Sequence, residues 1–249
     1  MDLETSTINR WQIFWNKLEK GRNLVRRRIG FERAQFILQH LTTDQLGGAR
    51  IFDLGCGYAE VSRHLLAEIP ESTLLGFDWS ADALKVAKQG TVAFAKRADL
   101  AHENYFNDFG FFGKHEDRND LILSLGVVEH FPDPARIIKR IAQVLDLGGV
   151  LVPMTPNRRS RAALSRKIKE ILGTCTFGYQ RKYSPEDLES WCIDAGLQIL
   201  SKHSLLRQEN PIGDRILRFF SVIDRWFSRV IPRWGFCSYV FAAEGRRHV

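Results

Sequence analysis

The sequence predicts an α/β protein with a doubly wound, mainly parallel sheet. An apolar run at residues 51–54 leads into a glycine-rich turn, which is followed by a helical pattern as far as residue 66. A second run of this kind, at residues 73–78, is also followed by a helical pattern. Residues 121–125 are almost wholly apolar, as expected of a strand that is buried on both faces. Strands that alternate with helices in this way indicate βαβ units.

Length and composition fit one soluble globular domain. The chain has 249 residues, of which 44% are hydrophobic and 26% charged, and a domain of this size can bury a sizeable core. Its four cysteines form no CxxC pair, so neither a zinc site nor a disulfide framework is expected. The polar N-terminus and the lack of an apolar run of about 20 residues predict a cytoplasmic protein.

The net charge of +7 is unevenly distributed. Residues 158–182 hold eight basic residues and one acidic residue, and residues 1–33 and 207–247 each hold eight basic and four acidic residues. The rest of the chain is therefore acidic. Basic segments suit an anionic lipid surface, a nucleic acid or an acidic substrate, and a solvated basic face is an equally open interpretation.

The first unit carries the strongest binding signal. Gly55 and Gly57 allow a sharp turn and a close ligand approach, and the N–H groups of the following helix point to the same place. A dinucleotide fingerprint has Gly or Ala where this chain has Glu60, which would repel a pyrophosphate. Asp53 adds a second acid just before the turn. Two acids favour a ligand with cationic groups, such as the ammonium and sulfonium of S-adenosylmethionine.

The second unit ends its strand with Asp78, 21 positions after Gly57. A carboxylate at about this offset takes the hydroxyls of an adenosine ribose, because it can accept two hydrogen bonds at once. Trp79 would then lie against the adenine face. The alternative role for Asp78 is helix N-cap, in which Ser80 competes with it.

The third unit is predicted as a helix over residues 80–89 and a strand over residues 92–96. The strand would end at Asp99 and Leu100, where Asp99 accepts from the adenine amino group and backbone N–H groups read the ring. An ordinary loop aspartate is the alternative. Residues 101–119, rich in aromatics, are compatible with a loop over the sheet edge or with a pocket wall.

The fourth strand, residues 120–125, leads into a turn that carries Glu129 and His130. The turn lies at the carboxyl end of a strand, where doubly wound folds bind ligands. His130 is the best candidate for a general base because imidazole titrates near neutral pH, although a structural histidine is equally possible. Pro134 is expected to begin the next helix, and residues 150–154 to form a fifth strand.

With these motifs in place, the chain resembles the class I S-adenosylmethionine-dependent methyltransferases of the small-molecule and lipid type, which include ubiquinone-biosynthesis O-methyltransferases. The matching stretches are DLGCG at 53–57, GFD at 76–78, AD at 98–99, DLILSLGVVEHFPDP at 120–134, LDLGGVLVPMTPN at 145–157, YSPEDL at 183–188 and GFCSYVFAAEG at 235–245. The resemblance implies a Rossmann-like, seven-stranded sheet whose last strand is antiparallel. The chain has no NPPY- or DPPY-like element after the fourth strand, which disfavours a nucleic-acid substrate.

The resemblance also implies roles for individual residues. The turn from Asp53 through Gly55, Cys56 and Gly57 would shape the methionine end of the cofactor site. Asp78 would bind the ribose and Asp99 the adenine. The methyl side would be lined by Ser124 and Leu125.

The whole chain, 1–249, is predicted to be one methyltransferase domain. Residues 1–45 would form N-terminal helices, and helical insertions at 157–182 and 208–234 would cap the site. Residues 212–231 place aromatic and aliphatic residues on one helical face and four arginines on the other. This is the composition of a helix that lies on an anionic membrane surface. Packing on its own domain is the alternative.

The expected reaction is methyl transfer to an O, N or C nucleophile of a hydrophobic or lipid-like acceptor. Such an enzyme must mainly hold the acceptor in line and exclude water. A base is needed only if the nucleophile loses a proton; His130 is the first candidate, followed by Tyr183 and Glu129. No metal cluster is predicted. The alternatives are an RNA methyltransferase that uses the basic segments, and a cofactor-binding regulator without turnover.

Overall fold

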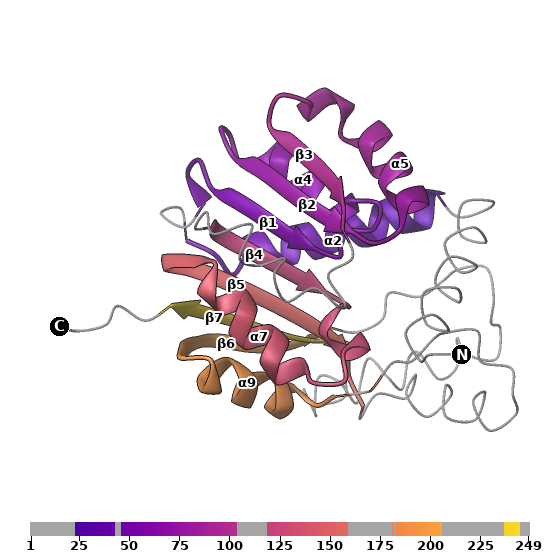
Figure 1. Ribbon diagram of the computed structural model, residues 1–249. Coiled ribbons are helices and arrows are strands. Elements are labelled where there is room, and N and C mark those ends of the chain that lie inside the picture. The colour runs from indigo at the N-terminus through magenta and orange to yellow at the C-terminus, as the bar shows by residue number, and fades with distance from the viewer. Residues whose placement is uncertain are drawn as a thin grey trace, which may run out of the picture.

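The described residues of the computed structural model, 23–42, 46–103, 119–158, 181, 183–205 and 237–244, build a three-layer α/β fold around one sheet (Figure 1). The sheet has seven strands in the order β3-β2-β1-β4-β5-β7-β6, and β7 runs antiparallel to its neighbours β5 and β6. This confirms the predicted fold class. The strands are β1 (Arg50–Leu54), β2 (Thr73–Asp78), β3 (Ala98–His102), β4 (Asn119–Leu125), β5 (Leu145–Pro156), β6 (Leu197–Leu205) and β7 (Cys237–Glu244).

Helices cover both faces of the sheet because the strands are apolar on both sides. One apolar core lies under α2 (Asn23–Leu38), α4 (Glu60–Glu68) and α5 (Ala81–Gly90). The other lies under α7 (Pro134–Gln143) and α9 (Pro185–Asp194), which pass in front of the sheet in Figure 1. Two short 3-10 turns, η1 (Val92–Phe94) and η2 (Val128–His130), complete the described elements.

The predicted helix starts are confirmed by their caps. Ser80 precedes α5, and its hydroxyl accepts from the Ala83 N–H. Asp133 caps α7, whose first residue is Pro134 as predicted. Ser184 and Asp187 form a capping box at the start of α9. The described part of the predicted N-terminal helices is α2 (Asn23–Leu38), which includes the three-arginine run at residues 26–28.

The predicted third strand is wrong. Residues 92–94 form η1 instead, and Val92 is 71% exposed, so little of its side chain is buried as it would be in a strand. Arg97 then donates to the carbonyls of Leu66 and Ser72, at 3.0 and 2.9 Å, which ties this segment to the end of α4. Strand pairing with β2 therefore begins only at Ala98.

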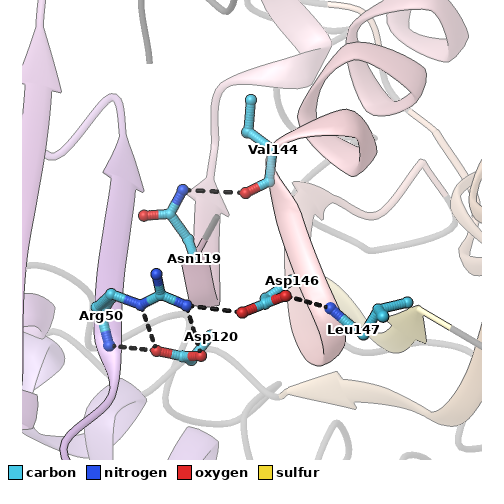
Figure 2. Close-up of polar contacts among 6 residues, drawn as sticks. All are labelled: Arg50, Asn119, Asp120, Val144, Asp146 and Leu147. Carbon is cyan, nitrogen blue, oxygen red and sulfur yellow. Dashed lines mark hydrogen bonds and ion pairs between the residues drawn. The ribbon is translucent and has the colours of Figure 1, made fainter. Parts of the chain in front are cut away.

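Polar contacts at the amino edge of the sheet join β1, β4 and β5 (Figure 2). Arg50 bonds both oxygens of Asp120, at 3.0 and 3.2 Å, and one oxygen of Asp146 at 2.8 Å. Burial acts to raise the pKa of Asp120, but its hydrogen bonds with Arg50 outweigh that effect and hold the pKa below its usual range. The three side chains are partly exposed, so each ion pair contributes about 1 kcal/mol or less.

Most of the predicted insertions lie outside the described residues. This holds for 159–180 and 182, for 206–236, and for residues 1–22. The amphipathic segment 212–231 is among them. Among the helices that the structure does describe, none is long and apolar enough to cross a membrane.

Candidate active site

The glycine turn after β1 is tied to the end of β2. The Gly55 and Cys56 N–H groups both donate to the Phe77 carbonyl, at 2.8 and 2.9 Å. Gly55 and Gly57 have φ values of 72° and 54°, in the left-handed region that glycine adopts without strain. The Gly57 N–H donates to one carboxylate oxygen of Asp78 at 2.8 Å. The turn is therefore held directly above the predicted ribose-binding carboxylate.

Asp78 lies at the carboxyl edge, as the sequence predicted for its strand. It is 3% exposed, and its second oxygen accepts from the Ser80 N–H at 2.8 Å. Burial raises its pKa to about 6, although the N–H groups of Ser80 and Gly57 and the neighbouring His102 act in the opposite direction. Each carboxylate oxygen has a further lone pair, so the group retains the capacity to accept from a diol.

Asp53 is the second buried acid of the turn. It is 3% exposed and accepts from the Ser62 hydroxyl of α4. Burial raises its pKa to about 7; the Ser62 hydrogen bond lowers it, and the nearby Asp78 raises it further. The turn thus holds two carboxyl groups whose ionised forms are disfavoured by burial, and a cationic ligand would reverse this.

The N-terminus of α4 carries no capping side chain. Its N-cap is Ala59, in the left-handed region with φ 53°, which has no polar atom beyond its backbone. Glu60, predicted to repel a pyrophosphate, is paired with Arg63 at 2.5 Å, so a cation one turn further along the helix offsets its charge. The first-turn N–H groups of this helix suit a small carboxylate such as that of methionine.

The structure contradicts the predicted positions of Asp99 and Leu100. Asp99 is the second residue of β3, is exposed and pairs with Leu75. Leu100 is buried in the core, with its Cδ2 only 2.5 Å from where a Cβ on Gly76 would lie. Because β3 begins later than predicted, both residues lie away from the carboxyl edge.

His102 and Glu103 occupy the place expected for Asp99. His102 pairs with Asp78 across the strands, and its Nε2 lies 2.7 Å from the Trp79 carbonyl oxygen. The Glu103 N–H donates to the Asp78 carbonyl at 3.2 Å. The half-buried Trp79 packs against the core under α7, beside this edge. His102 was not predicted as a site residue because the strand was expected to end earlier, at Asp99 and Leu100.

The end of β4 brings Ser124, Leu125 and Glu129 to the same edge. Ser124 and Glu129 are fully buried, whereas Leu125 is half-buried. Gly126 has φ 82°, and its N–H donates to the Met154 carbonyl at 2.9 Å. A Glu129 carboxylate oxygen lies 3.6 Å from where a Cβ on Gly126 would be. The β4 turn therefore places Glu129 on the face covered by α2.

Arg33 of α2 was not singled out from the sequence. Burial acts to lower the pKa of its guanidinium, but the surrounding Tyr239, Cys237 and Glu129 raise it above the usual value. Burial also raises the pKa of Tyr239 to about 12, so Tyr239 is neutral at physiological pH. Glu129 is the carboxyl group among these three neighbours, and we expect it to balance the charge of Arg33. A signal for this pair was absent because Arg33 stands among many arginines near the N-terminus.

The predicted base candidates lie near one another in the fold. His130 is 8% exposed and is the last residue of η2, directly after Glu129. The Glu129 carbonyl accepts from the Arg181 N–H at 3.1 Å. Tyr183 forms a bridge with Asn157, just beyond β5, and its ring meets Trp191 edge-on at 4.7 Å. The structure thus brings Glu129, His130 and Tyr183 to the same end of the sheet. The described ranges contain no cluster of three metal-ligating side chains.

Comparisons with known proteins agree with this geometry. Residues 26–202 match the family described as methyltransferase domain. The ubiquinone biosynthesis O-methyltransferase of Coxiella burnetii is 29% identical over 194 residues, which cover 76% of this chain and 78% of that protein. Its counterpart in Aromatoleum aromaticum is 30% identical over 158 residues, covering 61% and 65% of the two chains.

Solved structures share the fold. Magnesium protoporphyrin IX methyltransferase from Synechocystis PCC 6803, with bound SAH, superimposes with a TM-score of 0.62 at 17% identity, covering 96% of this chain and 94% of that one. A SAM-dependent methyltransferase from Archaeoglobus fulgidus gives a TM-score of 0.61 at 16% identity, covering 94% and 99%.

The fold and its glycine–acid edge define a class I methyltransferase architecture. The chain belongs to the methyltransferase domain family and is an S-adenosylmethionine-dependent methyltransferase. The residues present fit this cofactor: the two left-handed glycines of the turn carry no side chain, the α4 N-terminus has no capping side chain, and two buried carboxyl groups favour a cationic partner.

The buried carboxyl groups predict how cofactor binding depends on pH. With pKa values of about 7 for Asp53 and about 6 for Asp78, both are partly protonated in mildly acidic solution. Because a cation favours their ionised forms, S-adenosylmethionine binding should release protons. The affinity should rise as pH increases from 5.5 to 8, by up to about tenfold per pH unit in the steep region. Calorimetry in buffers of different ionisation enthalpy measures both effects.

Uncharged 5′-methylthioadenosine is the control ligand: it keeps the ribose that Asp78 would bind but lacks the cationic methionine end, so its affinity should change less over this range and its binding should release fewer protons. In the ligand-free protein, the same two carboxyl groups should make the folding stability decrease as pH rises. A raised pKa in the folded state adds stability below the unfolded pKa of about 4, and that contribution disappears as pH rises through 6 to 7. The cofactor should therefore stabilise the fold more at pH 8 than at pH 5.5. Equal proton release by both ligands would contradict the assignment.

Proposed function

We propose that this enzyme methylates an oxygen nucleophile on a hydrophobic, lipid-like small molecule. The observation that carries the proposal is the carboxyl edge of the sheet, where the buried Asp53 and Asp78 meet the glycine turn on one side and Glu129, His130 and Tyr183 gather on the other. The choice of oxygen, and of a hydrophobic acceptor, is supported by relatives named as ubiquinone biosynthesis O-methyltransferases over more than three quarters of their length.

The cofactor would lie across the ends of β1, β2 and β4. Asp78 would accept from the ribose hydroxyls, and Trp79 with His102 would flank the adenine. The turn of Gly55, Cys56 and Gly57 and the first turn of α4 would receive the methionine end. Ser124 and Leu125 would line the methyl side. Arg33 supplies a half-buried cation on α2 that suits the methionine carboxylate, while Glu129 offsets part of its charge.

When bound, S-adenosylmethionine supplies a methyl group that its sulfonium makes electrophilic. The protein must hold the acceptor in line and exclude water. An acceptor hydroxyl must also lose its proton as the new O–C bond forms, and we assign this proton to His130. Glu129 is less suited because Arg33 stabilises its ionised form; its role is to position the turn. Tyr183 would orient the acceptor from the opposite side.

Methyl transfer tests this function directly. Purified protein is incubated with methyl-tritiated S-adenosylmethionine and the neutral lipid extract of its host, and label in the organic phase is counted. His130→Asn should lower transfer by about 100-fold at pH 7, in the range seen for loss of a general base, with less effect at high pH where a hydroxyl ionises by itself. Cofactor affinity should not change.

His64→Asn is the matched control, since His64 lies on α4, away from η2. Label that stays in the aqueous phase with wild type would exclude a lipid-like acceptor. Unchanged transfer by His130→Asn would exclude His130 as the base. Salt-sensitive labelling of RNA would instead favour the nucleic-acid alternative.

We further infer that the chain is one domain whose segments 157–182 and 208–234 cap the acceptor, and that 212–231 rests on an anionic membrane. The second inference predicts flotation with vesicles containing phosphatidylserine, weakened by salt. Replacing Arg215, Arg218, Arg225 and Arg229 with Gln should abolish flotation. Replacing four basic residues of the described helices, Lys85, Lys88, Lys139 and Arg140, should not. Flotation that survives the first set would exclude this segment as the contact.

A further inference from the structure

Three buried hydroxyl groups on neighbouring strands have no hydrogen-bond partner in the described structure. They belong to Ser124 on β4, Thr155 on β5 and Ser238 on β7, and all three residues are 0% exposed. A buried hydroxyl without a partner costs free energy, and native proteins leave few of them. Three together, at the edge of the sheet that binds ligands, call for an explanation.

The three hydroxyls lie on one face of the sheet. Side chains alternate between faces along a strand, and Ile122, Leu151 and Val240 all belong to the core under α7 and α9. Ser124 follows Ile122 by two residues, Thr155 follows Leu151 by four, and Ser238 precedes Val240 by two. They therefore face the α7 and α9 layer. The hydroxyl of Tyr239, which also lacks a partner, faces the opposite way, toward Arg33.

The strand register brings the three close together. Thr155 pairs directly with Ser238 across the antiparallel β5–β7 ladder, which places their Cβ atoms about 5 Å apart. Ser124 pairs with Pro153, two residues before Thr155 on the same face of β5. Ser124 and Thr155 lie at the carboxyl ends of β4 and β5, and Ser238, near the start of the antiparallel β7, lies at the same edge of the sheet. Tyr183 lies just beyond, bridged to Asn157.

We propose that Ser124, Thr155 and Ser238 form a polar subsite that binds an uncharged oxygen group of the acceptor, such as a hydroxyl or a carbonyl. A hydroxyl side chain can both donate and accept, so it matches such a group. The core residues on this face are apolar, so a carboxylate placed among them would carry a much larger desolvation cost than an uncharged oxygen group. The subsite therefore favours a neutral acceptor over an acid. This inference rests on the proposed function and specifies which part of the acceptor is recognised.

The test uses naphthalene derivatives as probes, because they are hydrophobic and differ in one substituent. Binding of 2-naphthol, 2-methoxynaphthalene and 2-naphthoate is measured by NMR titration with the full chain saturated with S-adenosylhomocysteine. Wild type should bind naphthol best and naphthoate worst. Thr155→Val and Ser238→Ala should each weaken naphthol binding about five- to tenfold, the effect of one lost hydrogen bond, and reduce its advantage over the methyl ether.

Thr73→Val, an exposed threonine at the amino edge of β2, is the matched control and should bind like wild type. The variants should keep wild-type affinity for S-adenosylhomocysteine and should not lower the urea midpoint of the ligand-free protein, since the hydroxyls have no structural partner to lose. A lowered midpoint would overturn the proposal by revealing such a partner.

Unchanged naphthol binding in both variants would show that the hydroxyls hold only water, and would also overturn the proposal. So would failure of naphthol to bind at about 10 mM, which exceeds the dissociation constant expected of a fragment of this size. Failure of the proposed function looks different: the neutral lipid extract would remain unlabelled although S-adenosylhomocysteine binds.

Discussion

Asp78→Asn is expected to weaken S-adenosylmethionine binding by about 100-fold or more. The carboxylate is buried, and it accepts from the Gly57 and Ser80 N–H groups with one oxygen each. An asparagine has one acceptor oxygen, so its amide N–H₂ would face one of these donors. The glycine turn would lose a support, and a ribose would lose a charge-assisted acceptor, each worth about 1.5–3 kcal/mol. Calorimetry gives the dissociation constant.

Asp99→Asn is the matched control. The sequence and the structure predict different outcomes for this variant. The sequence predicted that Asp99 contacts the adenine, whereas the structure places it exposed near the amino end of β3. The structure therefore predicts a dissociation constant within about twofold of wild type, the scatter of a surface substitution. If Asp99→Asn binds as poorly as Asp78→Asn, the position of β3 is wrong. Circular dichroism must show that both variants are folded.

Gly30→Ala is expected to lower the free energy of unfolding by about 1–2 kcal/mol. An added Cβ would lie 2.6 Å from the Glu60 Cβ and 3.0 Å from its carbonyl carbon, so α2 and α4 could not keep their approach. Overpacking of this kind costs about 1–3 kcal/mol, more than the roughly 1 kcal/mol that alanine gains over glycine within a helix. Urea unfolding measures the difference.

The same change should also weaken cofactor binding, because Glu60 is the first residue of α4. Gly90→Ala is the control, since its nearest atom would be the Arg63 side chain at 3.5 Å, an ordinary contact at the end of α5. That variant should be as stable as wild type or up to about 1 kcal/mol more stable. A Gly30→Ala protein of wild-type stability would show that the two helices separate without cost.

Local chemistry in the sequence was enough to place several elements. Pro134 was predicted to begin a helix and does so, because its fixed φ and missing N–H suit the first helical position and neither depends on distant residues. The glycine turn and Asp78 were predictable for a related reason. The turn needs residues that adopt positive φ without strain, which predicts glycine at 55 and 57. Asp78 ends the next parallel strand, so it lies at the same edge of the sheet as the turn.

Features that depend on contacts between distant segments were not predictable in this way. Where β3 begins is decided by Arg97, which bonds carbonyls at the end of α4, and by pairing with β2; neither contact leaves a local pattern. The balance of charge between Arg33 and Glu129 likewise needs α2 to cross the end of β4. The shared face of Ser124, Thr155 and Ser238 follows only from the register of three strands.

By itself the sequence determined the class of fold, the glycine–acid edge and the class of cofactor. These follow from the spacing of glycines and acids over short stretches and from the alternation of strand and helix patterns. The tertiary structure alone decided where individual side chains lie: it placed Asp99 near the amino end of β3, His102 beside Asp78 and Arg33 close to Glu129, and it put three buried hydroxyls on one face. The physical reason is that burial and pairing are properties of the packed sheet. The residues that surround a side chain are fixed only once each strand has paired with its neighbour in a defined register.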